Sequence, residues 1–174
     1  PAQHTEGLSN TTRDGRLAPL LENVGNLSYP VATRSPEAQR FFNQGLTLVY
    51  AFNHAEALRS FREAARLDPE CAMAYWGQAL ALAPNINDPA IGEDREKQGY
   101  EAINEAVRRK AGASAKEQAL IDALHARFSG DPGDRDALNR RYAEAMGKVY
   151  ARYPDDPDVA TLYADAVMNT SPWN

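Results

Sequence analysis

Residues 36–71 encode a helix followed at once by a second helix, and this pair constrains the fold more than any other part of the sequence. Ser35-Pro36-Glu37 begins the first helix, because serine caps free N–H groups, proline suits the first helical position and an acid suits the dipole. We expect this helix to end near residue 51, and the second to run from about 54 to 67, where Asp68-Pro69 stops it. Small residues and one aromatic let the two backbones approach and fill their seam: Gly45, Ala57 and Phe61.

The spacing of these residues resembles the 34-residue unit of the tetratricopeptide repeat (TPR) family. Residues 38–71 match that unit at six positions, namely Phe41, Gly45, Ala57, Phe61, Ala64 and Pro69. The Asp68-Pro69 motif recurs as Asp156-Pro157. The resemblance implies an all-α, TPR-like α-solenoid of antiparallel helix pairs. Its repeats are expected at about 38–71, 72–115 and 116–159, with an incomplete repeat at 160–174.

The alanine distribution separates an N-terminal arm from the repeats. Only three of the 30 alanines lie in residues 1–34, which we expect to be irregular apart from one helical turn near 17–23. Residues 35–174 form the expected repeat domain. Its seven helices are predicted at about 36–51, 54–67, 70–83, 92–110, 114–129, 134–153 and 157–170.

Composition and motifs narrow the function classes. A net charge of −5 and a pI near 5.2 argue against nucleic acid as a partner, and no apolar run approaches the ~20 residues of a membrane span. The single cysteine, Cys71, excludes an intrachain disulfide. No phosphate-binding loop, nucleophile elbow or metal-ligand spacing occurs, so we predict no cofactor, no metal site and no catalytic residue.

The resemblance also implies a concave face formed by the first helix of each repeat. The residues expected to line it are mainly apolar: Phe42, Leu46, Tyr50, Met73, Trp76, Leu80, Leu120 and Leu124. Such a groove suits a protein or peptide partner with apolar anchors, which predicts a scaffold or adaptor and not an enzyme. It lacks the lysine and asparagine that TPR domains use to grip a terminal carboxylate.

Two alternatives stay open for this groove and its surroundings. The N-terminal arm, a later part of a longer chain or a second copy could cover the groove, so self-association is one outcome. The other alternative is a metal- or small-molecule-handling site near His54. His54, Asn85 and Asn87 are expected as neighbours that form a polar lock between repeats, with a metal at His54, Cys71 or Met73 as the rival interpretation.

Two stretches resemble a group of longer bacterial TPR proteins that mostly lack an assigned activity. They are Phe52-Asn53-His54-Ala55-Glu56-Ala57 and Cys71-Ala72-Met73-Ala74-Tyr75-Trp76-Gly77, the second followed by Ala83-Pro84-Asn85-Ile86-Asn87. The resemblance implies that this chain is the N-terminal part of something longer. Because members of the group often carry an export signal, it also favours a periplasmic or otherwise exported location over the cytoplasm.

Overall fold

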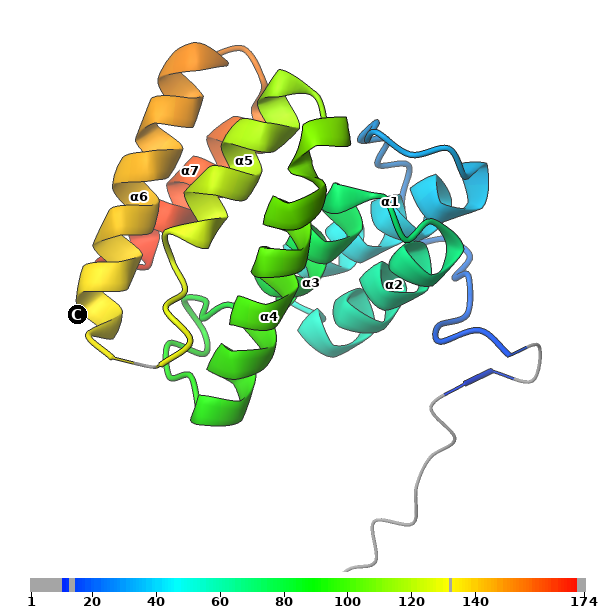
Figure 1. Cartoon of the computed structure of the whole chain (residues 1–174), viewed down its shortest axis with the longest axis horizontal. Coiled ribbons are helices and arrows are strands. Elements are labelled where there is room, and N and C mark those ends of the chain that lie inside the picture. Colours follow the sequence, from blue (N-terminus) through cyan, green and yellow to red (C-terminus); the bar gives the residue numbers. More distant parts are fainter. Residues whose placement is uncertain (1–10, 13–14, 132, 172–174) are drawn as a thin grey trace, which may run out of the picture.

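A computed structural model describes residues 11–12, 15–131 and 133–171; the other residues of the expected arm, and the last three of the repeat expected at 160–174, lie outside this part. Within the described part, the chain is all-α, with seven α-helices and no strand (Figure 1). The helices are α1 (Pro36–Tyr50), α2 (His54–Leu67), α3 (Ala72–Leu82), α4 (Glu93–Arg109), α5 (Ala115–His125), α6 (Arg135–Arg152) and α7 (Pro157–Met168), with a 3₁₀ turn η1 (Lys110–Gly112) after α4. The expected number and order of helices are confirmed.

The helix ends differ from expectation where the backbone changes its hydrogen bonding. Helix α5 ends at His125, about one turn before the expected residue 129, because the N–H groups of Ala126 and Arg127 bond three residues back, to Ala123 and Leu124. The helical turn expected near 17–23 is wrong. The N–H groups of Leu17 and Leu21 instead donate to side chains of α2 and α1.

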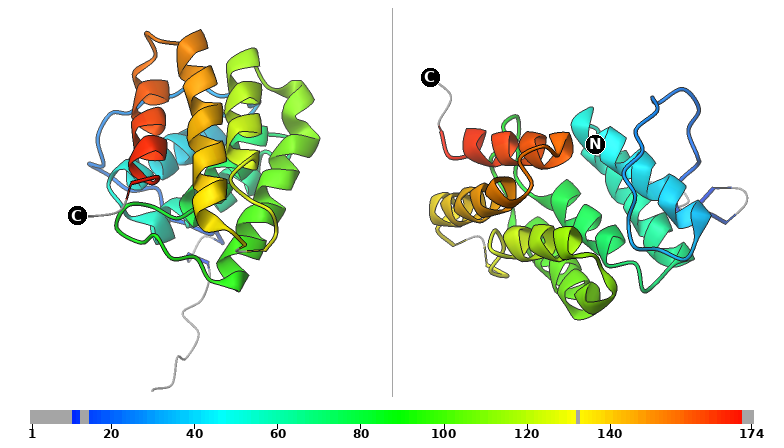
Figure 2. Two further views of the ribbon diagram at one scale, coloured as in Figure 1. Left: turned by 90° about the vertical axis from the view of Figure 1, so that its left-hand side faces the viewer. Right: turned by 90° about the horizontal axis from the view of Figure 1, so that it is seen from above.

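The helices pack mainly against their neighbours in sequence, and α3 also contacts both α1 and α5 (Figure 2). The last helix returns toward the first. The Tyr50 hydroxyl at the end of α1 donates to Asp158 of α7 at 2.8 Å, and Figure 2 (right) shows the start of α7 close to the end of α1. The elements that line the expected concave side therefore approach one another across it.

Phe61 of α2 lies in the seam between α1 and α3, as the sequence predicts. A Cβ atom added to Gly45 of α1 would lie 2.7 Å from the Phe61 ring, and one added to Gly77 of α3 would lie 2.4 Å from it. Phe61 is fully buried. These two glycines let both helices press directly on the ring.

The arm is tied to the helices by its backbone. Leu17 N–H donates to Glu63 at 3.0 Å and Leu21 N–H to Gln44 at 2.7 Å. Further along, Ala32 N–H donates to Glu117 of α5 at 2.7 Å. The arm also buries Ala18 and Tyr29, whose ring lies 6.0 Å from that of Phe42.

None of the helices in the described part is long and apolar enough to cross a membrane.

Candidate functional site: a cavity between α1, α3 and α7

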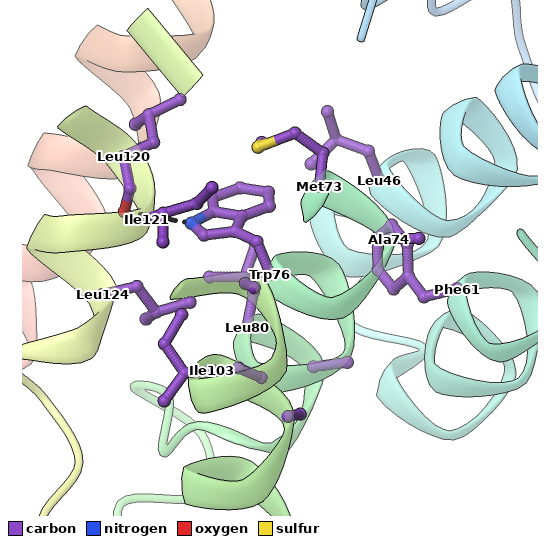
Figure 3. Packing of buried hydrophobic residues seen from close by; sticks show 14 of the residues in the cluster. Leu46, Phe61, Met73, Ala74, Trp76, Leu80, Ile103, Leu120, Ile121 and Leu124 are labelled. Atoms are coloured by element: carbon purple, nitrogen blue, oxygen red, sulfur yellow. Dashed lines mark hydrogen bonds between the residues drawn. The ribbon is translucent and has the colours of Figure 1, made fainter. Parts of the chain in front are cut away.

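The residues expected to line an apolar groove form the core instead. Seven are at most 6 % exposed: Phe42, Leu46, Met73, Trp76, Leu80, Leu120 and Leu124. Figure 3 shows Trp76 of α3 lying among Leu120, Ile121 and Leu124 of α5, and its Nε1 donates to the Leu120 carbonyl at 3.2 Å. Tyr50 is half-buried. The structure brings these residues together, but as the contact between α1, α3 and α5 and not as a surface open to a partner.

The predicted polar lock is not formed. The Asn85 side-chain oxygen accepts from the N–H groups of Asn87 and Asp88, so this amide shapes its own turn. Both ring nitrogens of His54 are buried and have no hydrogen-bond partner among the residues that the structure describes. His54 and Asn85 do border the same cavity, whereas Asn87 is exposed and lies outside its lining.

The cavity has a volume of about 140 Å³. Its walls combine apolar side chains with polar ones from several different elements. The lining residues are Val49, Tyr50, Phe52, His54, Leu80, Pro84, Asn85, Arg127, Thr161, Leu162 and Asp165. Because Phe52 is 53 % exposed, the cavity reaches the surface beside this ring.

Arg127 is a buried arginine without a carboxylate partner. It is 1 % exposed, and no carboxylate of the described chain lies within ion-pair distance of it. Its Nε donates to Asn139 at 3.1 Å, its guanidinium lies 4.7 Å from the centre of the Tyr142 ring, and its Nη2 has no partner. A buried cation is normally paired, because the interior replaces its hydration poorly. The lining therefore includes a buried guanidinium that has no carboxylate within ion-pair distance, although Asp165 of the same lining acts on its charge from further away.

Two further titratable groups of the lining, those of His54 and Asp165, are shifted toward their neutral forms. Burial lowers the pKa of His54, with Asp165 opposing the shift. Burial likewise raises the pKa of the Asp165 carboxyl, although Arg127, a hydrogen bond from Asn169 and His54 act against it. Shifted pairs of this kind gather at functional sites, since ordinary cores avoid titratable groups.

Phe52 holds a strained backbone at the cavity mouth. Its φ of 58° is left-handed, and the N–H groups of Phe52 and Asn53 bond to Val49 and Leu48 in the pattern that ends many helices. Glycine or asparagine normally takes this place, because a bulky side chain is unfavourable there. The Phe52 ring meets His54 edge-on at 6.0 Å. Strain that persists beside a cavity is typical of functional sites.

Metal binding, the rival interpretation of His54, gains no support from the geometry. The described part of the chain contains no group of three histidine, cysteine, aspartate or glutamate side chains that could hold an ion. Cys71 is buried at the start of α3 and does not border the cavity, and burial raises the pKa of its thiol to about 11. Met73 is buried in the core as well.

Arg127 and Asp165 were not anticipated from the sequence. Residue 127 falls inside the helix expected over 114–129, whereas in the structure it follows the end of α5 and is buried. Asp165 stands in an ordinary helical pattern within α7. No local spacing marks either residue, because the cavity assembles elements that are distant in the chain.

In comparisons with known proteins, no family model, curated protein or solved structure matches the chain.

Proposed function

We propose that the chain is a binding module built on TPR-like helix pairs, and that it holds a small ligand in the cavity between α1, α3 and α7. The single observation that carries the proposal is the Arg127 guanidinium, which is 1 % exposed, has no carboxylate partner, keeps an unpartnered Nη2 and borders the cavity. The TPR-like assignment is supported by Phe61, which packs against Gly45 and Gly77 at the positions that the repeat pattern requires.

Binding of a small ligand in this cavity agrees with the structure better than binding of a peptide in an apolar groove. Trp76 and its neighbours already contact one another, so a partner could reach them only by separating α3 from α5. A cavity of about 140 Å³ compares with the ~150 Å³ engineered cavity that accepts benzene. The proposed ligand is thus a small molecule of about one ring.

Binding also fits better than catalysis. The lining holds two hydroxyl groups that could act as nucleophiles, and both already donate a hydrogen bond: Thr161 to the Pro157 carbonyl within its own helix, and Tyr50 to Asp158. His54, the natural base, makes no hydrogen bond to either hydroxyl or to Asp165. A nucleophile with a base in hydrogen-bond reach would be the expected arrangement for covalent catalysis.

Filling the cavity tests this proposal. A mixture of small aromatic compounds that includes neutral and charged members should shift the amide NMR signals of residues around Leu80 and Leu162. Val49→Phe, which inserts a ring into the lining, should abolish those shifts. Val107→Phe is the matched control, because Val107 is also half-buried on a helix but does not border the cavity. Unchanged spectra of the parent protein with every compound would refute the proposal.

A further inference from the structure

The charge inside the cavity indicates what its ligand must carry. Burial lowers the pKa of the Arg127 guanidinium, but arginine keeps its proton at neutral pH because its ordinary pKa exceeds ~12. His54 and Asp165 border the same space in environments that disfavour their charged forms. The face of the Tyr142 ring attracts the Arg127 guanidinium, but this attraction replaces only part of the hydration that the cation loses on burial. An anionic oxygen is the partner that would satisfy the free Nη2.

The shape and the walls define the rest of the ligand. Val49, Leu80, Pro84 and Leu162 present apolar surface, and the volume admits about one ring. A single cation suits a single negative charge. A phosphate or a dicarboxylate would bring a second charge next to Asp165 of α7, without another cation in the lining to meet it.

We infer, as an extension that rests on the proposed binding function, that the cavity selects a small monocarboxylate with an apolar body, about the size of benzoate. The carboxylate would pair with the Arg127 guanidinium, and the body would contact Leu80 and Leu162. His54 borders the same cavity with two unpartnered nitrogens, and its neutral ring would donate its one N–H to the second carboxylate oxygen. Phe52 at the surface would close over the body.

The experiment compares sodium benzoate with benzamide on the full chain, by isothermal titration calorimetry and amide NMR shifts in a buffer low in chloride. The two compounds share shape and differ in charge. Benzoate should bind roughly tenfold to a hundredfold more tightly, the range expected for a charge-assisted hydrogen bond. A third arm uses acetyl-Ala-Ala-Phe with a free carboxylate, which presents the same chemistry at the end of a peptide.

Arg127→Met should remove the preference for benzoate. Replacing an unpaired buried cation by an apolar side chain is often neutral or stabilising, so this variant is expected to fold, which circular dichroism verifies. Arg140→Met is the matched control: it removes an exposed arginine from α6 and should leave the preference intact. If Arg127→Met fails to fold, the benzoate–benzamide comparison on the parent chain still decides the question.

The outcomes separate the two proposals. Equal binding of benzoate and benzamide, with shifts at the cavity, would overturn the carboxylate inference and leave the binding function in place. Binding of the peptide without binding of benzoate would overturn the small-acid ligand. Absence of shifts with all three compounds would overturn the inference, and with it the binding function if the wider mixture is also silent.

Discussion

Replacing Gly77 by alanine should destabilise the protein even though alanine is the better helix former. The added Cβ would lie 2.4 Å from two atoms of the Phe61 ring. The ring cannot retreat, because Gly45 of α1 presses on it as well. Overpacking a core costs typically ~1–3 kcal/mol, and a contact this short belongs at the upper end of that range. The higher helix propensity of alanine offsets at most about 1 kcal/mol of this cost.

We therefore expect Gly77→Ala to lower the free energy of unfolding by about 2 kcal/mol, or Tm by roughly 4–8 °C for a chain of this length. Urea unfolding followed by circular dichroism measures the change. The matched control is Gly147→Ala in α6, where the new Cβ would lie 3.4 Å from Tyr163, an ordinary contact. That variant should gain up to about 1 kcal/mol.

A double variant tests the assigned cause. Phe61→Leu shortens the group that the new methyl meets, so it should cost less in the Gly77→Ala background than in the parent chain. The reasoning is refuted if Gly77→Ala is as stable as the parent, or if the two substitutions are simply additive.

Four further substitutions address the core, the buried ion pair and the cavity. Trp76→Ala should lower the free energy of unfolding by about 3–5 kcal/mol, which circular dichroism would record as a lower Tm. A variant that is as stable as the parent but loses partner binding would instead support the apolar-groove hypothesis. Glu96→Ala removes the buried carboxylate that accepts from Arg135 at 2.6 Å and should cost about 3–5 kcal/mol in urea unfolding; a change below 1 kcal/mol would contradict it. Because burial lowers the pKa of His54, folding favours its neutral ring, so its contribution to stability is complete above pH ~6.5 and is lost as pH falls. Unfolding measured from pH 7.5 to about 5.5 should thus show a slope that His54→Gln reduces, since the side chains that act on His54, namely Asp165, Asp88 and Arg95, are the same in both proteins. Phe52→Gly should relieve the left-handed strain and raise stability by about 1 kcal/mol while weakening ligand binding; a loss of stability would show that the ring is structural.

The sequence predicted the helices well because their signals are local. Ser35, Asn53 and Asp156 each cap the helix that they precede, by accepting from backbone N–H groups. Phe61 and Gly45 were predictable too, since a small residue facing an aromatic at helical spacing determines how two helices pack. The antiparallel helix pair follows from these residues alone.

The site was only partly predictable, because it depends on where distant elements meet. The sequence selected His54 and Asn85, which do border the cavity, but it assigned them a hydrogen bond that does not exist. The apolar residues of the expected groove were chosen from positions in an open solenoid. In the structure, α7 returns to α1 through Tyr50 and Asp158, and the space between α3 and α5 is filled by Trp76. A pattern of apolar residues cannot tell an open face from a closed one.

The attachment of the arm decides how the chain can be shortened. Gln44 is 4 % exposed and Glu63 is fully buried, and both use arm backbone groups as partners. A fragment that started at residue 35, where the helices begin, would leave these two side chains and the sites of Ala18 and Tyr29 facing water. Such a fragment would carry a newly exposed, partly apolar patch and would tend to aggregate. The boundary near residue 34 is thus a change of secondary structure within one folding unit, and a soluble short version of the protein has to start before Arg16.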